Sequence, residues 1–237
     1  MTDLAIATAK SPAGRILDLG AIEASLRELQ AQFPRINQLL ACRRDSIDNG
    51  IVANMMAGYA FVDSLVADRR DIFGMGHLKL FLEINALVLC GRDERQRAQA
   101  QAHLVATERR FYEEEGGGIR DVVEWYALHK RETPWKRAAG VYVRILSEPE
   151  LFIEGNHRSG ALVMSYILAR EGHPPFVLTV ENAKAYLDPS TLITKTRKKS
   201  IAMLYRMPRI KRYFAEFLRE QADPKYLLSA PAAALPR

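Results

Sequence analysis

The most informative segment of the chain reads FIEGNHRS, from Phe152 to Ser159. It places Gly155 and Asn156 between two helical patterns, just where the second pattern begins. Such a turn directs backbone N–H groups into one concavity at the positive end of the next helix dipole, which favours phosphate. Arg158 adds a permanently charged, fork-shaped donor for phosphate oxygens. Glu154 supplies a carboxylate for Mg²⁺, which proteins commonly hold with one or two carboxylates plus substrate oxygens.

Helical periodicity surrounds this segment. Apolar residues recur at three- and four-residue steps, whereas period-two alternation is nearly absent, so the predicted fold class is all-α. Helices are expected over residues 21–44, 51–66, 78–89, 93–112, 121–130, 134–147 and 159–169, with a loop and short helix over 174–188 and a basic helix or pair over 195–219. Ser159 is expected to cap the helix after the segment. The glycines near Gly116 to Arg120 permit one short β-hairpin.

The composition is that of a globular protein. Of 237 residues, 48% are hydrophobic and 26% charged, which excludes disorder or a collagen-like repeat as the dominant state. Cys42 and Cys90 are too few and too far apart for a disulfide scaffold or a CxxC site, and we expect two reduced, buried thiols in a cytoplasmic protein. No secretory signal pattern is seen. The apolar run from Gly50 to Ala67 contains Asn54 and Asp63, which favours a buried helix over a membrane span.

Three regions are expected along the chain: an N-terminal helical region over 1–77 packed on the core, a core over 78–192, and a basic helical extension over 193–237. The formal charge of +6 favours polyanionic partners in general. A basic stripe in the extension predicts either a solvated helix face or a surface for nucleic acid or lipid headgroups. The stripe comprises Lys195, Arg197, Lys198, Lys199, Arg206, Arg209, Lys211 and Arg212.

The segment resembles the motif of the Fic family, which runs His-x-Phe-x-Asp/Glu-Gly-Asn-x-Arg-x-x-Arg between two helices. The matching positions are Phe152, Glu154, Gly155, Asn156 and Arg158, and the likeness covers roughly residues 78–192. The resemblance implies an all-helical domain that binds ATP or another nucleotide through its pyrophosphate and transfers AMP to a hydroxyl of a protein target. It also implies a flap around residues 116–119 that aligns this target.

Carried over by position, the resemblance implies that Gly155, Asn156, His157 and Arg158 bind the nucleotide and that Glu154 holds Mg²⁺. His157 occupies a variable position of the motif. As an exposed loop residue it is expected to contact phosphate or solvent rather than the acceptor hydroxyl.

Two departures from the motif bear on the chemistry. Glu150 stands where the family has its catalytic His, and a carboxylate near pKa ~4.3 is a far weaker base than imidazole unless burial raises its pKa. The donors nearby are expected to lower that pKa instead. Ala161 stands where the second motif Arg is expected. The family's inhibitory helix is also altered, because its nearest counterpart here is the stretch from Arg44 to Asn49, with Arg in place of the hydroxyl and Asp in place of Glu.

Three functions follow as hypotheses. The first is a nucleotidyltransferase that transfers AMP, or a related phosphate-containing group, to a protein hydroxyl, with Glu150 and Arg158 as the catalytic residues. The second is an inactive Fic relative that binds a nucleotide or partner as a regulatory module. The third is nucleic-acid binding through the basic stripe, the least favoured of the three.

Overall fold

The computed structural model describes residues 14–113, 117–198 and 200–228. Within these ranges the chain is helical, and β pairing is confined to two isolated bridges, Leu17 with Leu227 and Glu148 with Arg197. The helices are α1 (Leu19–Leu39), α2 (Asn49–Ala67), α3 (Lys79–Cys90), α4 (Glu94–Gln99), α5 (Gln101–Glu113), α6 (Ile119–Leu128), α7 (Pro134–Leu146), α8 (Asn156–Arg170), α9 (Ala183–Thr194), α10 (Ile201–Tyr205), α11 (Met207–Glu220) and the 3-10 helix η1 (Pro224–Tyr226). The all-α prediction is confirmed.

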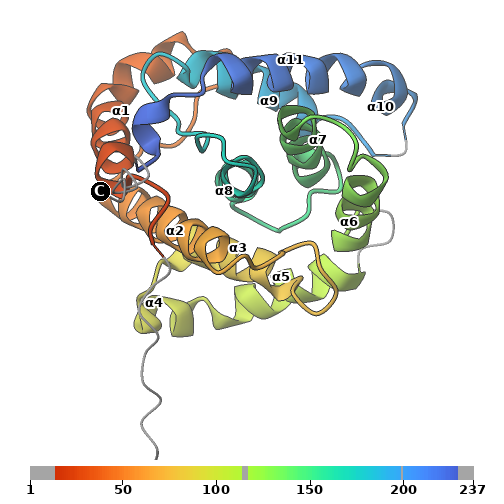
Figure 1. Cartoon of the computed structure of the whole chain (residues 1–237), viewed down its shortest axis with the longest axis horizontal. Coiled ribbons are helices and arrows are strands. Elements are labelled where there is room, and N and C mark those ends of the chain that lie inside the picture. The colour runs from red at the N-terminus through yellow and green to blue at the C-terminus, as the bar shows by residue number, and fades with distance from the viewer. Residues whose placement is uncertain (1–13, 114–116, 199, 229–237) are drawn as a thin grey trace, which may run out of the picture.

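Helix α8 forms the centre of the molecule. Figure 1 looks along it and shows the other helices arranged around it. Its residues from Ser159 to Ala169 are all buried, as expected for a stretch of helix that has no charged side chain on any face. α8 packs against α2, α3 and α7. At Gly160 a Cβ would lie only 2.7 Å from Cδ2 of Tyr142, so glycine allows α7 and α8 to meet in close contact.

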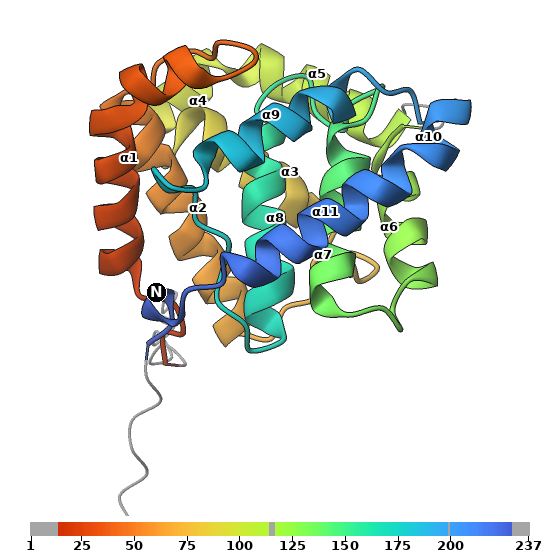
Figure 2. The ribbon, with the colours of Figure 1, turned by 90° about the horizontal axis from the view of Figure 1, so that it is seen from above.

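The N-terminal helices form one wall around α8, with α1 beside α2 (Figure 2). By length and composition α2 is apolar enough to cross a membrane, with a mean hydropathy of 1.4 over 18 residues. In the structure α2 packs against α1, α3 and α8. Asp63, in its middle, accepts the N–H groups of Ile16 and Leu17 at 2.8 and 2.9 Å, so this buried carboxylate fixes the start of α1. These contacts are those of a helix in the core of the fold, so α2 is used here for packing.

The opposite side is closed by α11, which crosses α7 (Figure 2). The segment after α11 returns to the start of α1. There, Asp18 N donates to the carbonyl of Tyr226 at 2.9 Å, and Leu228 N donates to that of Ile16 at 2.8 Å. The buried apolar residues form one core that runs from Leu17 to Tyr226.

Several expected elements differ in detail. α1 includes Pro34 and ends at Leu39, because the backbone of Leu40 is already extended, so the expected helix over 40–44 is wrong. The helix expected over 93–112 is two helices that meet at Ala100. The prediction of a hairpin near Gly116 to Arg120 is wrong for Ile119 and Arg120, because Ile119 starts α6. Residues 114–116 lie outside the described ranges.

The two cysteines lie in different environments. Cys90, at the end of α3, is buried as expected, and burial raises the pKa of its thiol. Cys42 is exposed, so the expectation that it is buried is wrong. It lies in the connection between α1 and α2, beyond the apolar periodicity of α1.

Candidate functional site

The turn before α8 depends on Gly155, which is the N-cap of that helix. Its φ of 76° lies in the left-handed region that favours glycine. A Cβ here would also lie 3.1 Å from Nδ2 of Asn85 and 3.2 Å from a methyl group of Val88, both on α3. Ser159 lies one turn inside α8, where its N–H donates to the carbonyl of Gly155. The expected Ser159 cap is therefore wrong, because backbone geometry rather than a side chain starts the helix.

Asn156 shapes the turn through three hydrogen bonds. Its Oδ1 accepts from the N–H of Phe152 at 2.9 Å, and its Nδ2 donates to the carbonyl of Phe152 at 2.8 Å and to Oε2 of Glu150 at 2.7 Å. The side chain is buried. Its amide group is therefore engaged within the protein, and its backbone N–H is the part that remains for a ligand.

The backbone N–H groups of the segment divide into two sets. Those of Leu151 and Phe152 are used internally, by the carbonyl of Ile145 and by Asn156. Among the hydrogen bonds of the described part of the chain, none uses the N–H groups of residues 153–158. These amides include the first three of α8, which carry the positive end of its dipole.

His157 points into the protein rather than to solvent. Its Nδ1 lies 3.2 Å from Oη of Tyr142, its Nε2 lies 3.5 Å from Nη1 of Arg44, and its carbonyl accepts from Tyr186 Oη at 3.1 Å. Burial, helped by the charge of Arg44, lowers the pKa of His157 to about 4. Because an arginine only donates, we assign the acceptor role to Nε2 and the proton to Nδ1. The expectation of an exposed His157 is wrong: it is a neutral, partly buried imidazole at pH 7.

Arg158 and Glu154 lie near each other at the turn, Arg158 partly buried and Glu154 exposed. Arg158 Nη1 donates to the carbonyl of Val88 at 3.0 Å, and its Nη2 is 4.0 Å from Oε1 of Glu154. Burial lowers the pKa of Arg158, opposed by Glu154 and Asp48, and the guanidinium stays charged. The Glu154 side chain is 65% exposed and is free to turn toward a ligand.

Glu150 lies at the other end of the turn, partly buried. Burial raises the pKa of its carboxyl, against the opposing effects of Arg110, the hydrogen bond from Asn156, and Lys198. The expectation of a lowered pKa is wrong, because desolvation outweighs the nearby donors. A raised pKa makes Glu150 a stronger base than an ordinary carboxylate.

These residues line one cavity of about 390 Å³. Residues 153–158, Glu150 and Ala161 form one side of it, and Ala161 brings no charge. Arg44 and Asp45 lie on the connection between α1 and α2. The opposite wall is apolar and comes from α1 and α2 and the short connection between them: Leu26, Leu29, Phe33, Ile47, Ile51, Val52 and Met55. The structure thus joins a polar turn with free amides to an apolar wall, on the scale of a small-molecule site.

The side chains at the turn fit Mg²⁺ only when the ion is bound together with a phosphate ligand. Within the described residues no group of three or more His, Cys, Asp or Glu side chains is arranged to hold a metal ion. Glu154 is a single exposed carboxylate beside the turn. One carboxylate suffices where substrate phosphates and water complete the octahedron, so Glu154 fits Mg²⁺ that arrives with a phosphate ligand.

Two contributors were missed from the sequence. Asn85 on α3 is buried and donates to the carbonyl of Glu154 at 2.9 Å and to Oγ of Ser159 at 3.0 Å, which fixes the turn against α3. Arg44 reaches His157 from 113 residues away in sequence. The stretch around it is no helix: residues 43–48 form a connection, and Asp48 caps α2 by accepting from Ile51 N at 2.7 Å.

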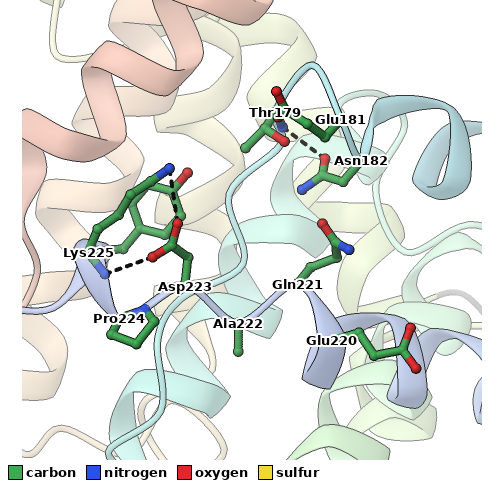
Figure 3. A pocket seen from close by; sticks show the side chains of 10 residues that line it. Thr179, Glu181, Asn182, Glu220, Gln221, Ala222, Asp223, Pro224 and Lys225 are labelled. Atoms are coloured by element: carbon green, nitrogen blue, oxygen red, sulfur yellow. Dashed lines mark hydrogen bonds and ion pairs between the residues drawn. The ribbon is translucent and has the colours of Figure 1, made fainter.

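A second hollow of about 430 Å³ lies between the start of α9 and the end of α11 (Figure 3). Two pairs form among its polar residues. Lys225 binds Oδ2 of Asp223 at 3.0 Å, and Asn182 Oδ1 accepts from Thr179 N at 2.8 Å. It contains none of the residues singled out from the sequence.

The basic stripe is not one exposed surface. Lys198 is buried and donates to the carbonyl of Gly117 at 2.7 Å, and Lys211 binds both carboxylate oxygens of Glu132 at 2.9 Å. Arg197 lies 3.3 Å from Glu148. Lys199 lies outside the described residues. The other residues of the stripe, Lys195, Arg206, Arg209 and Arg212, are exposed.

Comparison with known proteins gave no matching family model and no matching curated protein. Among solved structures the chain is similar to Fic-1 from C. elegans, with 18% sequence identity and a TM-score of 0.46. The match covers 86% of this chain and 60% of that one. The chain therefore spans less than two thirds of the Fic-1 structure that it matches.

Proposed function

We propose that the chain is a divergent Fic relative that binds the phosphate groups of a nucleotide at the start of α8 and transfers AMP to a protein hydroxyl. One observation carries the proposal: Glu150, Glu154, Arg158 and the unpaired amides of residues 153–158 line the same cavity. Free amides at a helix N-terminus together with a guanidinium suit a pyrophosphate.

Each group has a proposed role. The amides and Arg158 bind the phosphate oxygens and stabilise the charge that develops on the leaving pyrophosphate. Mg²⁺ held by Glu154 would neutralise further charge on the same oxygens. Glu150 takes the proton of the acceptor hydroxyl. At the same time the hydroxyl oxygen bonds to the α-phosphorus, and pyrophosphate leaves. The raised pKa of Glu150 supports its part as the base.

The hypothesis of an inactive binding module is supported by a different observation. Asn156 is fully engaged by the turn and Ala161 adds no cation from α8, so the α8 side offers a single guanidinium to the phosphates. In that case nucleotide binding occurs without transfer.

One experiment separates the two. The protein is incubated with Mg²⁺ and ATP labelled at the α-phosphate, alone and with cell lysate, and its melting temperature is measured with unlabelled ATP. Transfer predicts labelled protein that Arg158→Met and Glu150→Gln suppress. The control Glu148→Gln removes an exposed carboxylate of the same connection, paired with Arg197, and should leave labelling unchanged.

Stabilisation by ATP without labelling would support the binding module. If ATP neither stabilises nor labels, both proposals fail.

A further inference from the structure

The guanidinium of Arg44 lies in the wall of the cavity and contacts neutral groups. Nη2 donates to Oγ1 of Thr191 at 2.9 Å and to the carbonyl of Leu187 at 3.4 Å, and Nη1 lies 3.5 Å from Nε2 of His157. Since His157 is neutral at pH 7, none of these partners carries a negative charge. The negative charge of Asp188 acts on Arg44, but the ion pair of Asp188 is with Lys184. Arg44 is thus held in place without an ion pair of its own.

Arg44 also has unused hydrogen-bonding capacity. Its Nε is buried and has no partner, and within the described residues no carboxylate forms an ion pair with it. Partly buried charges in proteins are normally paired, because an unpaired charge loses hydration without compensation. A cation left in this state at a cavity wall points to an anion that binds in the cavity.

The carboxylates of the cavity do not supply that anion. Glu150 accepts from Asn156 and lies in the field of Arg110 and Lys198. Glu154 is exposed and lies 4.0 Å from Arg158. Asp45, next to Arg44 in sequence, is itself exposed.

The connection around Arg44 is held by the backbone of Arg44 as well as by its side chain. Its backbone is already anchored to α1, because Arg44 N donates to Oδ1 of Asn37 and Nδ2 of Asn37 donates to the carbonyl of Arg44, both at 2.7 Å. This reciprocal pair fixes the position of the connection. The position of the connection therefore does not depend on the Arg44 side chain alone.

We infer that Arg44 is a ligand-binding residue and that Arg44 and Arg158 bind separate anionic groups of one ligand, which makes the site selective for diphosphates and triphosphates over monophosphates. This inference rests on the proposed function. It adds Arg44, from the connection between α1 and α2, to Arg158 as the second cation that binds phosphate. Arg44 and Arg158 line the same cavity, together with the uncharged Ala161. Arg44 also contacts His157, the residue before Arg158.

The test compares ADP, AMP and inorganic pyrophosphate as probes, each with Mg²⁺, by calorimetric titration of the full chain. Arg44→Met should weaken ADP and pyrophosphate binding by about tenfold or more, the value of one charge-assisted contact, and AMP binding by about threefold at most. Arg43→Met is the matched control, because Arg43 is exposed beside it, and should change each Kd by less than about twofold.

The outcomes separate the two proposals. If the wild type binds ADP and Arg44→Met binds it equally well, Arg44 has no ligand role and the proposed function stands. If pyrophosphate binds through Arg44 while nucleotides do not bind, the anion site stands and the nucleotide function fails. If the wild type binds none of the probes, both are overturned.

A folding defect must be kept apart from a binding defect. Arg44→Gln, which keeps neutral donors near Thr191 and His157, serves as a second variant with the same expected loss. If neither variant folds, Arg44 is a structural residue and the inference is overturned.

Discussion

Nδ2 of Asn156 donates to Oε2 of Glu150 at 2.7 Å, so the residue that shapes the turn also holds the proposed base. The same amide group closes the turn on Phe152. The geometry of the turn and the protonation of Glu150 are therefore coupled through one side chain.

Replacing Asn156 tests this coupling. Asn156→Ala removes three hydrogen bonds and leaves Phe152 with unpaired backbone groups, so the free energy of unfolding should fall by about 2–4 kcal/mol. It also removes a bond that favours the ionised carboxylate, so the pKa of Glu150 should rise further. Urea titration measures the first effect, and NMR titration of the Glu150 carboxyl measures the second. An unchanged Glu150 pKa would contradict the coupling.

His157 should make the protein less stable as the solution is acidified. Its pKa is about 4 in the folded protein against 6.5 as the ordinary value. Above pH 6.5 both states are neutral. As the pH is lowered from 6.5 to 4, the unfolded chain takes up the proton before the folded protein does. The free energy of unfolding therefore decreases on acidification, by about 3 kcal/mol at most, and levels off below pH 4.

The variant His157→Gln isolates this effect. Other groups titrate in the same range, among them Glu150, whose raised pKa acts in the opposite direction, but they are present in both proteins. The difference in unfolding free energy between wild type and variant should therefore change between pH 7 and pH 4. A difference that stays constant with pH would mean that His157 titrates normally.

Gly155→Ala tests the backbone requirement of the turn. The left-handed φ and the 3.1 Å approach to Asn85 should together cost about 1–3 kcal/mol. Gly172→Ala is a matched control, because Gly172 has a φ of 79° but nothing within 4 Å of the added Cβ. The excess loss at Gly155, measured by chemical denaturation, reports its contact with α3. Equal losses at both sites would refute that contribution.

Lys198 should act on folding rather than on partners. Lys198→Met removes a buried donor to the carbonyl of Gly117 and should lower the unfolding free energy by about 1–3 kcal/mol. Lys195→Met, at an exposed position, should change it by less than about 0.5 kcal/mol. Thermal melts of both variants check this. A loss of nucleic-acid binding in Lys198→Met with unchanged stability would instead favour the basic-stripe hypothesis.

The sequence predicts most of the helices because their apolar spacing is local. It also indicates the turn, since Gly155 and Asn156 interrupt that spacing directly before a new helix begins. It fails where a contact joins distant segments. Asn85 carries no local signal, and Arg44 stands out in the sequence only as a departure from the inhibitory helix. Their roles come from contacts with His157, 113 residues from Arg44, and with Glu154, 69 residues from Asn85. The raised pKa of Glu150 depends in the same way on burial that only the packed helices create.

The cavity is lined by the turn before α8, by an apolar wall from α1 and α2, and by Leu178, Tyr186 and Leu187 from α9 and the segment that leads into it. A molecule that fills the cavity contacts the turn and the wall from α1 and α2 at once, so its binding requires that these parts are packed together. Ligand binding therefore reports whether these helices are packed together, and saturating ligand should raise the melting temperature. A fragment that starts at α3 would keep the whole turn yet lose this response.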